Sequence, residues 1–280
     1  MSASGSDRRD PNRKIRFQLL SDLHLEDDIS TYSSFVVPAR ADYLFLAGDI
    51  GSLVRKSHLE PFAAWLAVQC GKFKRVFYVG GNHEFWNSAR VADPVAEGTA
   101  QMRRFATQGR MRGRLVVLQN EHALLDADVN ISVLGCVLWS RLRRDQPSAG
   151  EAGRPGLVGF TQARQNERFE ESLQWIRDEV ARIRREDPQR RILVLTHYAP
   201  TVRYSNRPDL DAAGDRWSKW QSDILGGEGV EGLGEGDVWA YGHTHYSNTF
   251  YQDEVHVISN QRGRLADEIR RFDVNKVFEM

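Results

Sequence analysis

Five short apolar runs in this sequence each end beside a residue that can bind a metal ion. They lie at 15–21, 43–47, 76–79, 192–196 and 238–241. Near-continuous apolar runs of this length, rich in Val, Ile, Leu, Phe and Tyr, are typical of buried strands. Helical patterns lie between them at 59–68 and 162–186, where apolar residues recur every three or four positions. The sequence therefore predicts an α/β protein with a central sheet system and helices outside.

Two further strand pairs are predicted, one within 123–139 with a turn at 126–130, and one formed by 248–252 and 255–259. We expect residues 1–14 to form a flexible tail and residues 15–280 to form one domain. The tail holds no apolar stretch of the kind found in signal peptides, and no apolar run approaches the ~20 residues that span a bilayer. These features predict a cytoplasmic protein without membrane contact.

Composition argues against two classes of protein. Lys+Arg and Asp+Glu number 38 each, so the chain has no global charge to attract nucleic acid, and a nucleic-acid partner is not expected. Two cysteines, Cys70 and Cys136, are too few for a disulfide framework. Both lie in apolar surroundings, and we expect them to be buried thiols.

The predicted strand ends deliver seven oxygen or imidazole ligands. They are Asp22, His24, Asp49, Asn82, His197, His243 and His245. On an extended backbone, residues i and i+2 point to the same side, so Asp-x-His and His-x-His would each present two ligands together. In α/β sheets, ligands bind beyond the carboxyl ends of the strands. Seven such groups suit two divalent ions that share one carboxylate, and the mixed ligation favours Mn, Fe or Zn over Mg or Ca.

The order of these motifs resembles the calcineurin-like metallophosphoesterase superfamily. The matching motifs are DLH at 22–24, GD at 48–49, GNHE at 81–84, His197, and GHTH at 242–245. The resemblance implies a four-layer αββα sandwich of two mixed sheets. It implies one metal held by Asp22, His24, Asp49 and His245, and a second held by Asp49, Asn82, His197 and His243. It also implies that His83 is a catalytic histidine beside the ions.

The reaction implied by this resemblance is hydrolysis of a phosphate ester. Two metal ions polarise the phosphoryl oxygens and acidify a bridging water into hydroxide. His83 would neutralise charge on the phosphoryl group or protonate the leaving oxygen. Glu84 either orients nearby groups or is a salt-bridged or capping carboxylate.

Two departures from the superfamily's phosphoprotein phosphatases limit the substrate. Those enzymes carry an acid three residues after the GD aspartate, and arginines in the second and third motifs. Ser52 stands at the acid position and Gly80 at one arginine position. We therefore expect His83 to lack that acidic partner and the substrate to lack that guanidinium clamp, which disfavours a protein phosphatase.

Substrate contacts must then come from elsewhere. The segment 201–236 is a possible lid and carries Arg203, Arg207 and Arg216. Trp86 and Tyr198 would be able to stack on a base or an aromatic leaving group. For each of these residues the plainer interpretation, a solvated arginine or a core aromatic, is favoured.

The leading interpretation is a metal-dependent hydrolase that acts on a small-molecule phosphodiester or phosphomonoester. One alternative is a nuclease of the same superfamily, which the balanced charge disfavours. Another is a non-catalytic scaffold with this fold, which would be expected to lose ligands, whereas every motif position is filled here. The sequence chooses neither between the two ester classes nor among oligomeric states.

Overall fold

The computed structural model describes residues 14–86, 93–149, 156–208, 220–225, 229–264 and 271–280. The tail expected at 1–14 falls outside this description except for Lys14. Arg216 and parts of the possible lid at 201–236 also lie outside the described residues.

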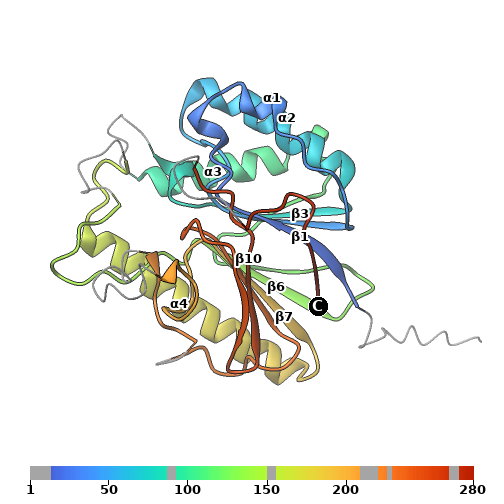
Figure 1. Cartoon of the computed structure of the whole chain (residues 1–280), viewed down its shortest axis with the longest axis vertical. Helices are drawn as coiled ribbons and strands as arrows, with labels where there is room; N and C mark the ends of the chain where they lie inside the picture. The colour runs from blue at the N-terminus through green and yellow to red at the C-terminus, as the bar shows by residue number, and fades with distance from the viewer. Residues whose placement is uncertain (1–13, 87–92, 150–155, 209–219, 226–228, 265–270) are drawn as a thin grey trace, which may run out of the picture.

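Two mixed β-sheets face each other in the middle of the molecule (Figure 1). The first has the order β11-β1-β2-β3-β4 and comprises β1 (Arg16–Leu20), β2 (Tyr43–Ala47), β3 (Arg75–Val79), β4 (Leu115–Val117) and β11 (Val277–Glu279). The second has the order β5-β6-β7-β8-β10-β9 and comprises β5 (Glu121–Leu124), β6 (Ile131–Cys136), β7 (Arg191–Thr196), β8 (Val238–Tyr241), β9 (Thr249–Gln252) and β10 (Val255–Ser259). Neighbouring inner strands pair in parallel, whereas β11, β5 and β9 are antiparallel edges.

The space between the sheets is filled by alternate residues of their strands. Phe45 and Phe77 stack with ring centroids 4.9 Å apart on the inner face of the first sheet. They share a buried cluster with Leu193 and Leu195 of the second sheet. The residues that alternate with them along the strands, such as Leu44 and Val194, belong to the cluster under the helices. This alternation explains why the inner strands are apolar on both faces.

Helices cover the outer faces of both sheets. The first sheet is covered by α1 (Thr31–Ser34), α2 (Lys56–Lys72) and α3 (Pro94–Ala106), and the second by α4 (Gln162–Glu186) (Figure 1). Three short 3₁₀ turns lie in the loops: η1 (Leu25–Asp27), η2 (His83–Phe85) and η3 (Gly109–Met111). The predicted four-layer arrangement is confirmed.

The long helix α4 has the bounds that the sequence pattern predicts. The Thr161 side chain accepts a hydrogen bond from the Arg164 amide and so caps its first turn. The predicted apolar stripe is buried: Phe169, Leu173, Ile176, Val180 and Ile183. The helix α3, which begins at Pro94 behind an Asp93 cap, is not predicted from the sequence pattern.

Both cysteines are buried and unpaired, as predicted. Cys70 lies in α2 and Cys136 ends β6. Among the described helices, none has both the length and the apolar character needed to cross a membrane.

Candidate metal centre

The seven predicted ligands lie in the loops that follow the parallel strands of both sheets. The loops after β1, β2 and β3 provide Asp22 and His24, Asp49, and Asn82. The loops after β7 and β8 provide His197, and His243 with His245. The centre therefore lies at the shared carboxyl edge of the two sheets, where an α/β protein is expected to bind its ligands.

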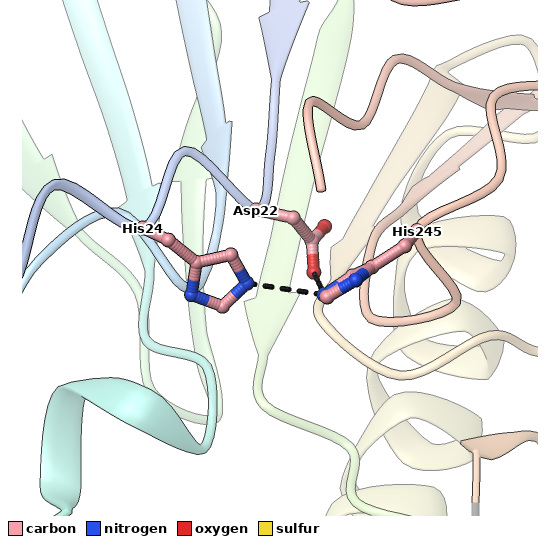
Figure 2. Close-up of side chains that lie close together, drawn as sticks. All are labelled: Asp22, His24 and His245. Atoms are coloured by element: carbon pink, nitrogen blue, oxygen red, sulfur yellow. Dashed lines mark hydrogen bonds and ion pairs between the residues drawn. The ribbon is translucent and has the colours of Figure 1, made fainter. Parts of the chain in front are cut away.

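Asp22, His24 and His245 form one group of converging ligand atoms (Figure 2). The Nε2 atoms of His24 and His245 are 3.0 Å apart, and Nε2 of His245 is 3.4 Å from Oδ1 of Asp22. Oδ2 of Asp49 lies 4.0 Å from Nε2 of His24. All three ligand atoms of the group lie within 4.8 Å of one another, close enough for one ion.

Asp49, His197 and His243 form a second such group. Nε2 of His197 lies 3.5 Å from Oδ1 of Asp49 and 3.1 Å from Nδ1 of His243. Oδ1 of Asn82 is 3.1 Å from the same Nε2 atom. Asp49 thus turns Oδ2 toward the first group and Oδ1 toward the second, which is the arrangement a bridging carboxylate needs.

The backbone of the ligand loops differs from the extended form expected from the sequence. Asp22, His24, Asp49, His243 and His245 all have left-handed φ angles, between 48° and 72°. The extended-strand argument for Asp-x-His and His-x-His is therefore wrong. Asp22 and His24 still converge, but His243 and His245 belong to different groups. Asp and His tolerate this conformation better than most residues, although it remains strained.

Two glycines let the ligand loops approach one another closely. A Cβ on Gly81 would lie 2.2 Å from Oδ1 of Asp49, and a Cβ on Gly242 would lie 2.0 Å from Oγ of Ser21. The Ser21 hydroxyl in turn donates a hydrogen bond to Oδ2 of Asp22. The glycines of the GNHE and GHTH motifs are therefore required by packing around the two carboxylates.

The charges in the centre are arranged around Asp49. Burial opposes its ionisation, yet the neighbouring His197 and His83 outweigh burial and hold the pKa of Asp49 well below its usual value. Burial alone would lower the pKa of His197, but Asp49 raises it to about 9. Burial and the charge of His197 together lower the pKa of His243 well below its usual value. Closely packed imidazoles thus compete for protons around buried carboxylates, an environment that favours a bound cation.

The hydrogen bonding of His197 supports metal binding. Its Nδ1 atom donates to the carbonyl oxygen of Ala47 at 2.8 Å, which leaves Nε2 as the unprotonated atom of the neutral ring. Nε2 points at Asp49 and Asn82. With two carboxylates, one amide and four imidazoles, the residues present fit two ions of the Mn, Fe or Zn type.

Glu26 is a site residue that the sequence analysis missed. Oε1 of this buried carboxylate lies 3.0 Å from Nδ1 of His83 and 3.0 Å from Nδ1 of His24. Ser52 provides no acidic partner for His83, as expected, and Glu26 takes that role in its place. Burial alone would raise the pKa of Glu26, but the hydrogen bonds with His24 and His83 lower it to about 2. The one sequence signal that could have identified Glu26 is its position two residues after His24.

Glu84 holds the loops after β2 and β3 together. Its Oε2 atom accepts hydrogen bonds from the amides of Asp49 and Gly81, and its Oε1 atom accepts from the Ile50 amide and the Tyr78 hydroxyl. Burial, reinforced by the charge of Asp49, raises the pKa of Glu84 to about 7. Of the interpretations left open, the structure favours a carboxylate that caps backbone amides and thereby orients Asp49.

The aromatic candidates pack against histidines of the centre. Trp86 stacks on His83 with ring centroids 3.5 Å apart. Tyr198 is 2% exposed and lies 3.9 Å from the ring of His243. Both aromatics therefore support histidine rings in this structure. Arg203 and Arg207 are exposed in the segment after β7.

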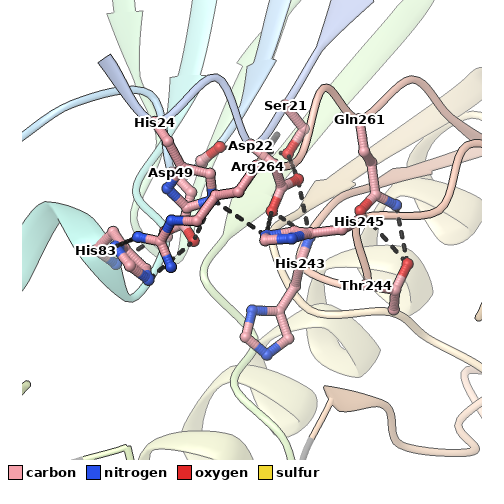
Figure 3. Close-up of polar contacts among 12 residues, drawn as sticks. Ser21, Asp22, His24, Asp49, His83, His243, Thr244, His245, Gln261 and Arg264 are labelled. Atoms are coloured by element: carbon pink, nitrogen blue, oxygen red, sulfur yellow. Dashed lines mark hydrogen bonds and ion pairs between the residues drawn. The ribbon is translucent and has the colours of Figure 1, made fainter. Parts of the chain in front are cut away.

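A different arginine reaches the centre. Nη2 of Arg264 lies 3.2 Å from Nδ1 of His83 (Figure 3). The guanidinium also pairs with Asp27. Arg264 was not a candidate in the sequence analysis, because it follows the last strand of the second sheet and lies outside the five motifs.

Comparison with known proteins shows which family and which proteins the chain resembles. Residues 15–247 match the family model described as calcineurin-like phosphoesterase. An uncharacterized protein of Acanthamoeba polyphaga mimivirus is 24% identical over 265 residues, covering 87% of this chain and 89% of that protein. The crystal structure of a phosphopantetheinyl hydrolase from Mycobacterium tuberculosis is similar in fold, with a TM-score of 0.61 and 17% identity. That similarity covers 95% of this chain and 96% of the hydrolase.

Proposed function

The chain belongs to the calcineurin-like phosphoesterase family and is a hydrolase of phosphate esters, and on this premise we propose that it acts on a small-molecule ester at a dinuclear metal centre. The observation that carries the proposal is the placement of Asp49 between two groups of ligands. The first ion would be held by Asp22, His24, Asp49 and His245. The second would be held by Asp49, Asn82, His197 and His243. When bound, two such ions would polarise the phosphoryl oxygens and make a water molecule acidic enough to attack.

His83 is proposed as the catalytic residue beside the ions. Its Nε2 atom lies 4.0 Å from Oδ2 of Asp49, so the ring faces the place where both ligand groups meet. Glu26 and the stacked ring of Trp86 hold the imidazole in this orientation. A proton at Nε2 would stabilise the transferring phosphoryl group or pass to the leaving oxygen.

The substrate is proposed only by class. The name of the similar mycobacterial structure describes hydrolysis of a phosphopantetheinyl group, and a small phosphate ester of this general kind suits the present centre. Both phosphodiesters and phosphomonoesters fit the proposal. A panel of these esters and cyclic nucleotides, assayed with Mn²⁺, would separate the two classes.

Metal content tests the dinuclear centre directly. Purified protein reconstituted with Mn²⁺ should hold close to two equivalents of metal per chain. Asp49→Asn should lower occupancy at both positions because one carboxylate serves both ions, whereas Asn82→Ala should affect mainly one. Elemental analysis that finds at most one equivalent in the reconstituted wild type would rule out the dinuclear proposal.

A further inference from the structure

The guanidinium of Arg264 lies beside the proposed catalytic histidine. This chain has no arginine at either of the two positions where phosphoprotein phosphatases carry one. Nε of Arg264 lies 2.8 Å from Oδ2 of Asp27, and Nη2 lies 3.2 Å from Oδ1, so the two side chains pair through two contacts. The same Nη2 atom is 3.2 Å from Nδ1 of His83. Figure 3 shows the guanidinium next to His83 and Asp49.

The backbone before Arg264 is tied to the loop that carries the first ligands. The amide of Arg262 donates to the carbonyl of Ser21, and the Arg262 side chain donates to the carbonyl of Leu23 at 2.7 Å. Gln261 also forms a bridge with Ser21. The segment that leads to Arg264 therefore runs along the loop after β1, and the position of its guanidinium is set by the same loop that sets Asp22 and His24.

The two acidic side chains of η1 lie in different environments and have different partners. Glu26 points inward, where its side chain is 2% exposed and contacts His24 and His83. Asp27 points outward, where its side chain is 50% exposed and pairs with Arg264, itself 37% exposed. An ion pair at this exposure contributes at most about 1 kcal/mol, so Asp27 orients the guanidinium and leaves it able to donate to an incoming anion as well.

The two contacts of Nδ1 of His83 exclude each other. When this nitrogen donates its hydrogen to Glu26, it cannot also accept one from Arg264. In that state an acceptor placed between Arg264 and the metal ligands would take a further hydrogen bond from the guanidinium. A phosphate oxygen is such an acceptor, and the planar fork of arginine matches phosphate geometry.

We propose that Arg264 binds the phosphate group of the substrate and that Asp27 is the positioning residue that holds its guanidinium beside His83. The inference rests on the proposed function, because it assumes that a phosphate ester occupies the centre. It gives this chain a substrate-binding arginine that comes from the segment after β10, in place of the arginines in the second and third motifs.

Binding of inorganic phosphate to the Mn²⁺-loaded protein tests the inference without turnover. Calorimetry should show that Arg264→Ala weakens phosphate binding by roughly 10–100-fold, the loss expected for one or two hydrogen bonds to a charged group. Metal content should stay at the wild-type value. In turnover assays the KM of the ester should rise, Arg264→Lys should restore part of the loss, and guanidinium ion added to Arg264→Ala should restore part of the activity.

Two further variants complete the test. Arg110→Ala removes an exposed two-contact ion pair with Glu60 away from the centre and should leave phosphate binding unchanged. Asp27→Asn should weaken phosphate binding less than Arg264→Ala, and should add nothing in the double variant if it acts through Arg264. Equal phosphate affinity in the wild type and Arg264→Ala, or no phosphate binding by either, overturns the inference. If the inference fails in this way but the wild type still holds two metal ions and hydrolyses esters, the proposed function is retained.

Discussion

Oε1 of Glu26 lies 3.0 Å from Nδ1 of His83, and this carboxylate replaces the acid that the phosphoprotein phosphatases carry at the position of Ser52. The same oxygen also orients the proposed ligand His24. Both histidines then present Nε2 at 4.0 Å from Oδ2 of Asp49. One buried side chain from η1 thus sets the direction of a proposed metal ligand and of the proposed catalytic residue.

Glu26→Ala should weaken metal binding at the position held by His24 and slow turnover, each by roughly 10–100-fold, since loss of a partner behind a ligating histidine has effects of this size. Glu26→Gln should do less, because its amide oxygen still accepts a hydrogen bond. Competition with a fluorescent chelator measures the metal affinity. Wild-type affinity and turnover in Glu26→Ala would mean that His24 and His83 keep their orientation without this carboxylate.

The metal-free protein should lose stability in acid partly through Glu26. The folded pKa of about 2 lies below the ordinary value of 4.5, because hydrogen bonds with His24 and His83 outweigh the effect of burial. The carboxylate therefore stabilises the fold above about pH 4.5, and this contribution is lost as the pH falls toward 2. Urea unfolding at about pH 6 and about pH 3 should show a smaller acid loss for Glu26→Gln than for the wild type. An equal or larger loss in the variant would contradict this assignment.

His83→Ala should retain both metal ions yet slow turnover by roughly 10²–10⁴-fold. If proton donation is its main role, the loss should shrink for aryl phosphates, whose leaving groups need no proton. If charge stabilisation on the phosphoryl group dominates, the loss should be the same for all leaving groups. Metal analysis provides the control, because a metal-depleted variant would show that His83 is a ligand.

Glu84→Gln should destabilise the protein by about 2–5 kcal/mol. Each carboxylate oxygen accepts from at least one backbone amide, so either orientation of the glutamine places its NH₂ group against a buried donor. Glu60→Gln, on the exposed face of α2, is the matched control and should change stability little. Denaturant unfolding measures both variants, and a wild-type midpoint for Glu84→Gln would disprove the role of Glu84 in holding the two loops.

The two thiols should be inert in the folded protein. Burial raises the pKa of Cys70 to about 11 and that of Cys136 to about 12, so little thiolate exists at neutral pH. A disulfide reagent such as Ellman's, added at about pH 8, should react with both only after denaturation. Rapid reaction of one thiol with the native protein would mean that its part of the core opens readily.

The sequence predicts the inner strands and α4 well because their apolar patterns are long and regular. The bounds of β2, β8, β10 and α4 agree with the prediction. It does not predict α3, because Gly98 weakens the helical pattern. Glycine is needed at this position since a Cβ there would lie 2.4 Å from the Phe85 ring. It also misses β4 and β11, which have three residues each, too few to show a period.

For the site, the motifs predict which ligands converge but not what surrounds them. Glu26 and Arg264 were missed because their roles arise from contacts across the fold, and Arg264 meets Asp27 across 237 positions of sequence. The left-handed backbone of the ligand loops was missed for a different reason. It occurs where the loops after β1 and β2 bind each other, the Asp22 amide donating to the Gly48 carbonyl and the His24 amide to the Asp49 carbonyl, and contacts of this kind leave little trace in local sequence.

The left-handed φ angles at the proposed ligands mean that the residues needed for function lower the stability of the fold. At such positions glycine relieves about 1–2 kcal/mol of strain but removes the ligand. His245, the most exposed ligand of the first group, shows the conflict most simply, since His245→Gly should melt higher than His245→Ala while both lose the same imidazole. A directed-evolution campaign that rewards heat resistance alone would therefore tend to erase the centre, and any thermostable variant needs turnover as a second selection.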